Sequence, residues 1–216
     1  MDYALAHFNM IEQQIRPWDV LDMRILDVMA ATPRHPFVPN GFESLAYSET
    51  LIPLNDQTVM LEPKIIGRFL QATNPQPHEN ALEVGTGSGY QTALLAQLCR
   101  YVDTIELNES LMSIAQDKLT KIGYQNIHCT QGNAYEVVPN TTYDVIVING
   151  SLTSKPATWL SLLNLGGRCV AVVGTGVAMQ AICYTRTEQH QWIEEVLFET
   201  ELPQLEGAKP VAAFSF

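Results

Sequence analysis

The part of this sequence best suited to chemistry is a run of alternate glycines, with one glutamate just before it and another at the end of the next apolar segment. The run Leu82-Glu83-Val84-Gly85-Thr86-Gly87-Ser88-Gly89 holds three alternate glycines, and Glu106 ends the next apolar segment. Glycines at this spacing form a turn in which a ligand can touch the backbone, and a carboxylate after the following strand can bind the hydroxyls of a ribose. The pattern therefore predicts a site for an adenosine-type ligand. The alternative, a turn that only joins a strand to a helix, gives no reason for the position of Glu106.

The details of the glycine run narrow the choice of ligand. The dinucleotide fingerprint needs its third glycine at position 90, where Tyr90 stands, and the Gly-Lys-Ser/Thr of a phosphate-binding loop is absent. An acidic residue, three alternate glycines and a ribose-binding acid in this order resemble the first motif of the class I methyltransferases. That resemblance implies S-adenosylmethionine as the cofactor.

Composition and charge exclude several other classes of protein. The 216 residues suit a single domain, and the net charge of −11 without a run of basic residues argues against a nucleic-acid partner. No apolar segment is long enough to span a membrane, and the N-terminus lacks the features of a signal peptide. The five histidines have no metal-ligand spacing, so we expect no metal site. Nothing in the sequence specifies an oligomeric state.

Cysteine usage indicates the compartment. The four cysteines form no Cys-x-x-Cys pair and stand in apolar or strand-like segments: Cys99, Cys129, Cys169 and Cys183. Isolated cysteines of this kind are typical of buried free thiols in a reducing environment. We therefore expect a cytoplasmic protein.

The chain divides at Asn74-Pro75-Gln76-Pro77 into a helical and loop segment, residues 1–73, and a core, residues 74–216. We expect these to form one domain, in which the first segment covers the second. The first segment has helical periodicity over residues 4–31, interrupted at Arg16-Pro17-Trp18, and again over residues 63–72. An extended stretch to about residue 47 and a loop lie between these helices.

The core alternates strands with helices. The expected strands are 81–84, 102–106, 126–130, 143–148, 167–173, 179–186 and 191–198, and the expected helices are 88–99, 109–122 and 156–163. Continuous apolar strands that alternate with helices indicate a mainly parallel sheet covered on both faces. The fold class is therefore α/β, a doubly wound Rossmann-like methyltransferase sheet with a C-terminal antiparallel hairpin and an N-terminal helical and loop extension.

The candidate cofactor site lies where these strands end, because ligands of doubly wound sheets bind at the carboxyl ends of the strands. The residues at those ends are Glu83, Gly85, Thr86, Gly87, Ser88 and Gly89, then Glu106 and Leu107, then Asn133 and Ala134, and finally Asn149. An amide at position 133 could pair with the adenine amino group, and Asn149 would flank the transferred methyl group. An asparagine after a strand is otherwise often just a turn residue.

A closer resemblance extends over roughly residues 9–200. Pro33-Arg34, Phe37-Val38-Pro39, Ala46-Tyr47, Pro53-Leu54 and Gln57-Thr58 stand in the order and spacing of the protein-L-isoaspartate O-methyltransferase family. The glycine run, with Tyr90 and Gln91 after it, and Leu165-Gly166-Gly167-Arg168 resemble the same family. The resemblance implies methylation of isoaspartyl carboxylates in damaged proteins, so the expected partner is a protein or peptide that carries isoaspartate.

This sequence departs from the family pattern on the acceptor side. The family has an active-site serine two residues after Gln-Thr, whereas the run Gln57-Thr58-Val59-Met60-Leu61-Glu62-Pro63 is one residue longer and has none. Gly132-Asn133-Ala134 replaces Gly-Asp-Gly, and Asn149-Gly150-Ser151-Leu152 replaces an alanine-rich run. Thr58 and Ser151 are the candidate substitutes for the lost hydroxyl.

Carboxyl methylation does not require a catalytic base. An aspartyl-type acid has a pKa of about 3.9, so the acceptor is already ionised at neutral pH and needs mainly alignment and desolvation. If Met60 or Leu61 instead filled the acceptor pocket, a charged acceptor would lose its hydration without compensation. The alternative is therefore a protein that binds S-adenosylmethionine but acts on another acceptor, or is inactive on isoaspartate.

Overall fold

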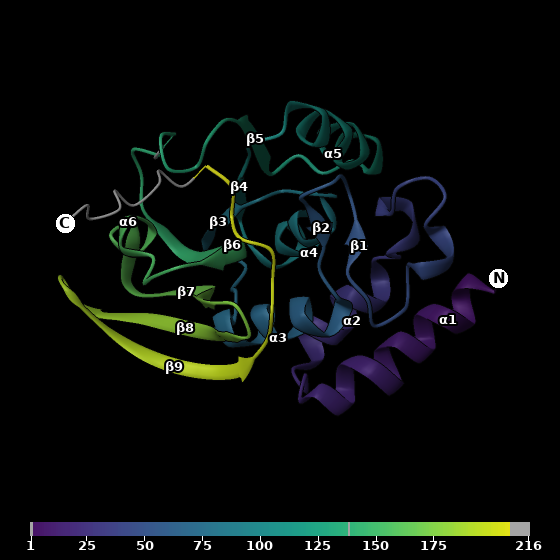
Figure 1. Ribbon diagram of the computed structural model, residues 1–216, viewed down its shortest axis with the longest axis horizontal. Coiled ribbons are helices and arrows are strands. Elements are labelled where there is room, and N and C mark those ends of the chain that lie inside the picture. The colour runs from purple at the N-terminus through teal and green to yellow at the C-terminus, as the bar shows by residue number, and fades with distance from the viewer. Residues whose placement is uncertain (1, 138, 208–216) are drawn as a thin grey trace.

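A seven-stranded sheet organises the computed structural model, which describes residues 2–137 and 139–207 (Figure 1). The strands run β5-β4-β3-β6-β7-β8-β9 across the sheet. Their bounds are β3 Asn80–Val84, β4 Tyr101–Glu106, β5 Ile127–Gln131, β6 Tyr143–Leu152, β7 Leu163–Thr175, β8 Ala178–Glu188 and β9 Gln191–Glu199. β3 to β7 pair in parallel, whereas β8 pairs antiparallel with both β7 and β9. The predicted parallel sheet with a C-terminal antiparallel hairpin is confirmed.

The order of the strands determines where in the fold the candidate site lies. β4 and β5 lie on one side of β3, whereas β6 and β7 lie on the other, so the chain reverses its direction of progress beside β3. Such a switch point opens a crevice at the carboxyl ends of the central strands. Glu83 and Glu106 both lie at these ends.

Alternate residues of the central strands enter separate cores on the two faces of the sheet. Val145 and Val147 pack with the N-terminal segment and α4 (Tyr90–Leu98), whereas Ile146 and Ile148 pack with Trp159 of α6 (Ala157–Leu160). A strand that is apolar on both sides must be covered on both sides. This requirement explains the continuous apolar strands of the sequence.

Most predicted boundaries differ from the observed ones by one or two residues, and the differences are larger around α6 and at the end of β6. The predicted helix 156–163 is only α6, because Leu163 already pairs with Tyr143 and begins β7. The strand predicted to end at 148 continues to Leu152, since Ser151 and Leu152 pair with β7 beyond a register shift. Both strands are extended by pairing with a segment that is distant in the sequence. A local sequence pattern carries no information about such pairing.

The N-terminal segment shares a hydrophobic core with the sheet. α1 (Tyr3–Asn9) continues through turns of π- and 3-10 helix to Trp18, and α2 (Met23–Ala31) begins after Asp22, which caps it through Arg24 N. The stretch predicted to be extended instead contains short 3-10 turns at 35–37 and 43–45. α3 (Pro63–Thr73) packs against β6 and β7, and its buried Ile65, Phe69 and Leu70 belong to the same core as Val145. None of the described helices is long and apolar enough to cross a bilayer.

A two-stranded hairpin carries the N-terminal segment to the carboxyl ends of the sheet. β1 (Ile52–Pro53) and β2 (Val59–Met60) pair antiparallel, and the side chain of Asn55 closes their turn by accepting from Gln57 N and Thr58 N at 2.8 and 2.7 Å. An asparagine that bonds to backbone two and three residues ahead is a common turn device. The hairpin thereby holds Gln57 and Thr58 over the sheet.

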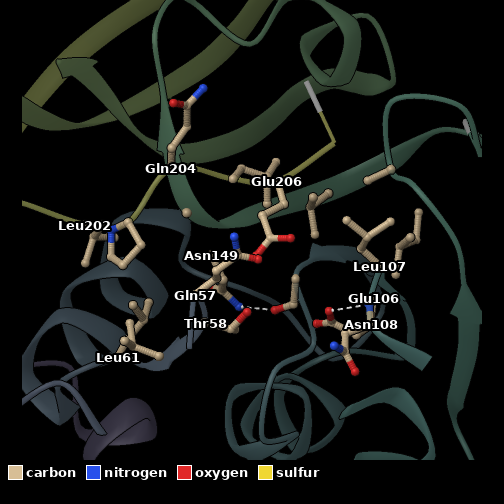
Figure 2. Close-up of a pocket in the computed structure, with 18 of the residues that line it drawn as sticks. Gln57, Thr58, Leu61, Glu106, Leu107, Asn108, Asn149, Leu202, Gln204 and Glu206 are labelled. Carbon is tan, nitrogen blue, oxygen red and sulfur yellow. Dashed lines mark hydrogen bonds between the residues drawn. The ribbon is translucent and has the colours of Figure 1, made fainter. Parts of the chain in front are cut away.

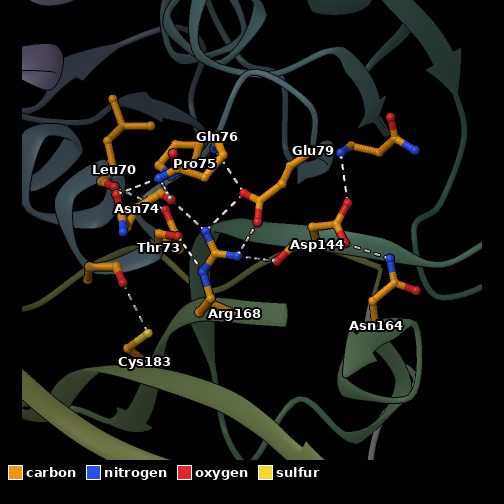
Figure 3. A network of polar contacts seen from close by, with 12 residues as sticks. Leu70, Thr73, Asn74, Pro75, Gln76, Glu79, Asp144, Asn164, Arg168 and Cys183 are labelled. Atoms are coloured by element: carbon orange, nitrogen blue, oxygen red, sulfur yellow. Dashed lines mark hydrogen bonds and ion pairs between the residues drawn. The ribbon is translucent and has the colours of Figure 1, made fainter. Parts of the chain in front are cut away.

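Arg168 of β7 joins the N-terminal segment to the sheet (Figure 3). Its guanidinium contacts both carboxylate oxygens of Glu79, at 2.7 and 3.0 Å, and donates to the carbonyl oxygens of Thr73 and Asn74, at 2.6 and 2.5 Å. The side chains of Arg168 and Glu79 are only 15% and 11% exposed. A planar guanidinium can make all of these contacts at once, which a lysine cannot.

We predict that Arg168→Ala lowers the free energy of unfolding by about 3–5 kcal/mol, because it leaves a mostly buried Glu79 carboxylate unpaired. Arg168→Lys should recover only part of this loss. Urea denaturation monitored by circular dichroism measures both. Arg16→Ala is the control, because the ion pair of Arg16 with Glu12 is more than one-third exposed and should contribute no more than about 1 kcal/mol. Equal losses for Arg16→Ala and Arg168→Ala would contradict the assigned role.

Candidate active site

The glycine turn brings backbone to the floor of a cleft at the carboxyl ends of β3, β4 and β6. Gly87 has a φ of 53°, and a Cβ atom there would lie 3.1 Å from Leu54 Cδ1 in the hairpin above. The left-handed conformation and the nearby hairpin both favour glycine at this position. Gly85 and Gly89 also have positive φ values.

Glu106 presents its carboxylate to the same cleft. Oε2 accepts from Gly87 N at 2.9 Å, and Oε1 accepts from Asn108 N at 3.0 Å. The residue is 6% exposed and lines the cleft. Because backbone amides fix both oxygens, the carboxylate is preorganised to accept further hydrogen bonds, such as those from the hydroxyls of a ribose.

Glu83 lies below the cleft and joins three elements of the core. Its Oε2 accepts from Thr92 Oγ1 of α4 at 2.5 Å and from Thr104 Oγ1 of β4 at 2.8 Å, while its Oε1 accepts from Asn149 Nδ2 of β6 at 3.1 Å. Glu83 is fully buried, and this burial raises its pKa to about 7 against the lowering effect of the three hydrogen bonds. Glu83 therefore contacts a residue that lines the cleft, Asn149, and does not line the cleft itself.

Asn149 connects the Glu83 carboxyl to the glycine turn. Its Nδ2 donates to Glu83 Oε1 and also to Gly85 O, at 3.0 Å. The carbonyl of Gly85 can only accept, so the amide nitrogen must face the turn. Asn149 also lines the cleft, and it does so from within β6, because that strand continues to Leu152.

The hairpin forms the opposite wall of the cleft. Gln57, Thr58 and Leu61 line it, and Figure 2 shows Thr58, Glu106 and Asn149 around the same space. The fully buried Arg34 holds Leu61 in place by donating from Nη2 to Leu61 O at 2.6 Å, and burial lowers the Arg34 pKa to about 10.

A C-terminal strap, residues 202–206, closes a further side of the cleft and was not predicted from the sequence (Figure 2). It runs beside the end of β6, where Ser151 N donates to Pro203 O and Leu205 N donates to Ser151 O, both at 2.9 Å. The only local signal was the apolar Leu202 and Leu205 after the last strand. These contacts are long-range, so no motif marks them.

The other predicted site residues lie in different parts of the structure, and not all of them line the cleft. Leu107 and Ala134 line the part of the cleft beyond Glu106, while Thr86 and Ser88 line the part beside the glycine turn. The Asn133 amide is engaged already, because Nδ2 donates to Gly207 O and Oδ1 accepts from Tyr135 N, both at 3.0 Å. Asn133 therefore holds Gly207, the residue after the strap, and it is not among the residues that line the cleft.

The two candidate hydroxyls differ in their surroundings. Thr58 lines the cleft, and within the described parts of the chain its hydroxyl makes no hydrogen bond. Ser151 is 1% exposed, and its Oγ donates to Leu202 O at 2.9 Å. The geometry therefore favours Thr58 over Ser151 as a hydroxyl that meets a ligand.

The residues present fit S-adenosylmethionine. Three features lie along one cleft: the glycine turn, the preorganised carboxylate of Glu106, and the buried Oδ1 of Asn149, which has no hydrogen-bond partner among the described residues. The adenosine would lie beyond Glu106, near Leu107 and Ala134, and the amino-acid end beside the glycine turn. Among the described residues, no cluster of side chains could hold a metal ion.

Comparisons with known proteins agree with this assignment. The sequence profile of the protein-L-isoaspartate(D-aspartate) O-methyltransferase family matches residues 6–201. The chain is 36% identical over 201 residues to the protein-L-isoaspartate O-methyltransferase of Herpetosiphon aurantiacus, covering 93% of this chain and 89% of that protein. It is 30% identical to the Gloeobacter violaceus protein of the same name, covering 93% and 98% of the two chains.

Solved structures show the same fold. A Plasmodium falciparum chain described as a protein-L-isoaspartate O-methyltransferase, in complex with S-adenosyl-L-homocysteine, superposes with a TM-score of 0.80 at 18% identity, covering 93% of this chain and 98% of that chain. A second structure of that name gives 0.81 at 20% identity, over 93% of this chain and 66% of the other.

We predict that Gly87→Val blocks S-adenosylhomocysteine binding, because a branched side chain is strained at this φ and meets Leu54. Glu106→Ala should weaken binding by about 1.5–3 kcal/mol, roughly ten- to a hundred-fold in Kd, through loss of the ribose contacts. Calorimetry measures both values, and Glu109→Ala, an exposed acid next along the chain, should bind like wild type. Unchanged affinity in both site variants would refute the site.

Glu83 makes the stability of the protein depend on pH. Its pKa is raised to about 7 in the fold, so the folded chain binds more protons than the unfolded chain from about pH 4.5 to 7, and stability falls as pH rises through that range. Glu83→Gln cannot ionise. Its stability relative to wild type should therefore be about 3 kcal/mol greater at pH 8 than at pH 4.5. Urea denaturation at the two pH values measures this difference, and a pH-independent difference would show that the fold does not raise the pKa of Glu83.

Proposed function

This chain belongs to the protein-L-isoaspartate O-methyltransferase family, and from that premise we propose that it methylates the free carboxylate of L-isoaspartyl residues in damaged proteins. The observation that carries the proposal is the position of the Thr58 hydroxyl, across the cleft from Glu106 and the glycine turn (Figure 2). An acceptor held by Thr58 would lie next to the cofactor.

The chemistry is a displacement in which a carboxylate oxygen bonds to the methyl carbon while the bond from carbon to sulfur breaks. When bound, S-adenosylmethionine supplies that methyl group on a positively charged sulfur. The acceptor is ionised at neutral pH, because its pKa is about 3.9, so this chain needs no residue to remove a proton. Its residues align the acceptor and exclude water, a task suited to the mostly buried Leu61 and Leu202 at the cleft.

Thr58 supports the proposal as the substitute for the family serine. The Asn55 turn holds the Thr58 backbone directly before β2, and Arg34 holds Leu61 directly after β2. Both ends of this strand of the wall are therefore held by hydrogen bonds. A threonine hydroxyl can donate to a carboxylate as a serine hydroxyl does. Ser151 serves instead to hold Leu202 of the strap.

A second candidate function has its own supporting observation. Met60 and Leu61 line the part of the cleft beside the glycine turn, together with Ile66. This apolar wall favours an acceptor that is less polar than a carboxylate, because a buried charge needs hydrogen-bond partners. The enzyme would then be an S-adenosylmethionine-dependent methyltransferase with a different acceptor.

The cysteines support a cytoplasmic location. All four are free thiols. Burial raises the pKa of Cys99 to about 12 and that of Cys183 to about 11, so these thiols are poor nucleophiles and structural in character. Free structural thiols are typical of a reducing compartment such as the cytoplasm. The partners of the enzyme there would be aged proteins that carry isoaspartate.

We predict that the enzyme methylates an isoaspartyl peptide and not the matching aspartyl peptide, and that the product releases methanol in base. Thr58→Val should lower kcat/KM about ten- to a hundred-fold, because it removes a hydrogen bond to a charged acceptor. Thr58→Ser keeps the hydroxyl and is the control, with most of the activity retained.

A radiolabelled methyl-transfer assay measures these rates. Absence of transfer to the isoaspartyl peptide, under conditions in which calorimetry shows cofactor binding, would reject this function and favour the alternative acceptor.

A further inference from the structure

Arg34 is a buried cation whose charge no described residue neutralises. Its side chain is 0% exposed, and besides the bond from Nη2 to Leu61 O, its Nε and Nη1 are buried without a hydrogen-bond partner in the described part of the chain. None of the ion pairs among the described residues includes Arg34. Burial lowers its pKa only to about 10, so the guanidinium is charged at neutral pH. A buried charge without a counter-ion is costly, and an anionic ligand would offset that cost.

The titratable groups whose fields act on Arg34 leave its charge unbalanced. Glu62 is the one carboxylate among them, and its Oε2 lies 3.0 Å from Lys64 Nζ, so its charge is already paired. The others are Tyr47 and Tyr90, which are neutral at neutral pH because burial raises the pKa of both hydroxyls. The positive charge of Arg34 is therefore available to an anion that enters from outside.

A thin apolar wall separates Arg34 from the cleft. Leu61 accepts its hydrogen bond, and the ring centroid of Tyr90 lies 5.2 Å from Arg34 Cζ, and both residues line the cleft beside the glycine turn (Figure 2 shows Leu61). Met60 and Ile66, both buried, line the same part. Apolar side chains screen a charge far less than water does, so the field of Arg34 extends into the cleft.

We propose that Arg34 makes the acceptor pocket selective for anions, by attracting the acceptor carboxylate through the apolar wall rather than by touching it. This inference rests on the proposed isoaspartyl activity and adds a specificity-determining residue to it. Thr58 supplies the direct hydrogen bond, whereas Arg34 supplies the charge. The role explains how a carboxylate can enter beside Met60 and Leu61, and how a chain of net charge −11 attracts an anion to this cleft.

Two matched peptides isolate the effect of the acceptor charge. One carries the free isoaspartyl carboxylate, and the other carries a carboxamide in its place, which has a similar shape and no charge. In calorimetry on protein saturated with S-adenosylhomocysteine, the wild type should prefer the carboxylate peptide about ten-fold or more, and Arg34→Met should lower that preference about ten-fold. Arg34→Lys keeps the charge without the planar fork, so the preference should stay within about three-fold of wild type even where both peptides bind more weakly.

A charge control separates this role from a general effect of net charge. Arg24→Met removes an exposed guanidinium that is paired with Asp22 at 2.9 Å, and it should change the preference less than about two-fold. An unchanged preference in Arg34→Met, with S-adenosylhomocysteine binding retained, would overturn the role of Arg34 and leave the isoaspartyl function standing. A wild type that binds the two peptides equally would overturn both.

The salt dependence of the wild type provides a test that needs no variant. A buried cation is screened much less than surface charges, so the preference for the carboxylate peptide should fall less than about two-fold between about 0.05 and 0.5 M salt. A preference that disappears at high salt would assign the selectivity to surface charges and overturn the proposal, even if Arg34→Met does not fold.

Discussion

The buried carboxyl of Glu83 is the interaction on which the geometry of the site depends. It lies at the end of β3 and accepts hydrogen bonds from α4, β4 and β6 through Thr92, Thr104 and Asn149. Without these donors a buried carboxyl would be costly, and with them it fixes the elements around the glycine turn relative to one another. The raised pKa of Glu83 shows that burial still outweighs the hydrogen bonds.

Two glutamates near the carboxyl ends of adjacent strands, Glu83 of β3 and Glu106 of β4, have different surroundings. Glu106 lies at the cleft with its oxygens held by backbone amides, and is available to a ligand. Glu83 lies one layer deeper and orients Asn149, whose second bond reaches the glycine turn. Two carboxylates at the ends of adjacent strands therefore have different roles, which are set by burial.

The sequence predicted those features that depend on local pattern. Apolar strands, the glycine turn and the acid at position 106 follow from the spacing of a few residues, and the structure has them where they were expected. The strap at 202–206 and the engagement of Ser151 depend on contacts across about fifty residues, and the extension of β6 to Leu152 depends on pairing with β7 about twenty residues further along the chain. The buried amide of Gln91, which has no hydrogen-bond partner among the described residues, could not be inferred either, because its surroundings are set by the packed core.

A crystal structure with S-adenosylhomocysteine and an isoaspartyl peptide tests this account of the site most directly, because it places the cofactor and the acceptor in the same cleft. We expect the ribose hydroxyls to donate to Glu106. We also expect the Thr58 hydroxyl, or a backbone amide of the loop at 57–63, to face the sulfur and to contact the peptide carboxylate. A ribose bound away from Glu106, or a carboxylate enclosed by Met60 and Leu61 without a polar partner, would contradict it.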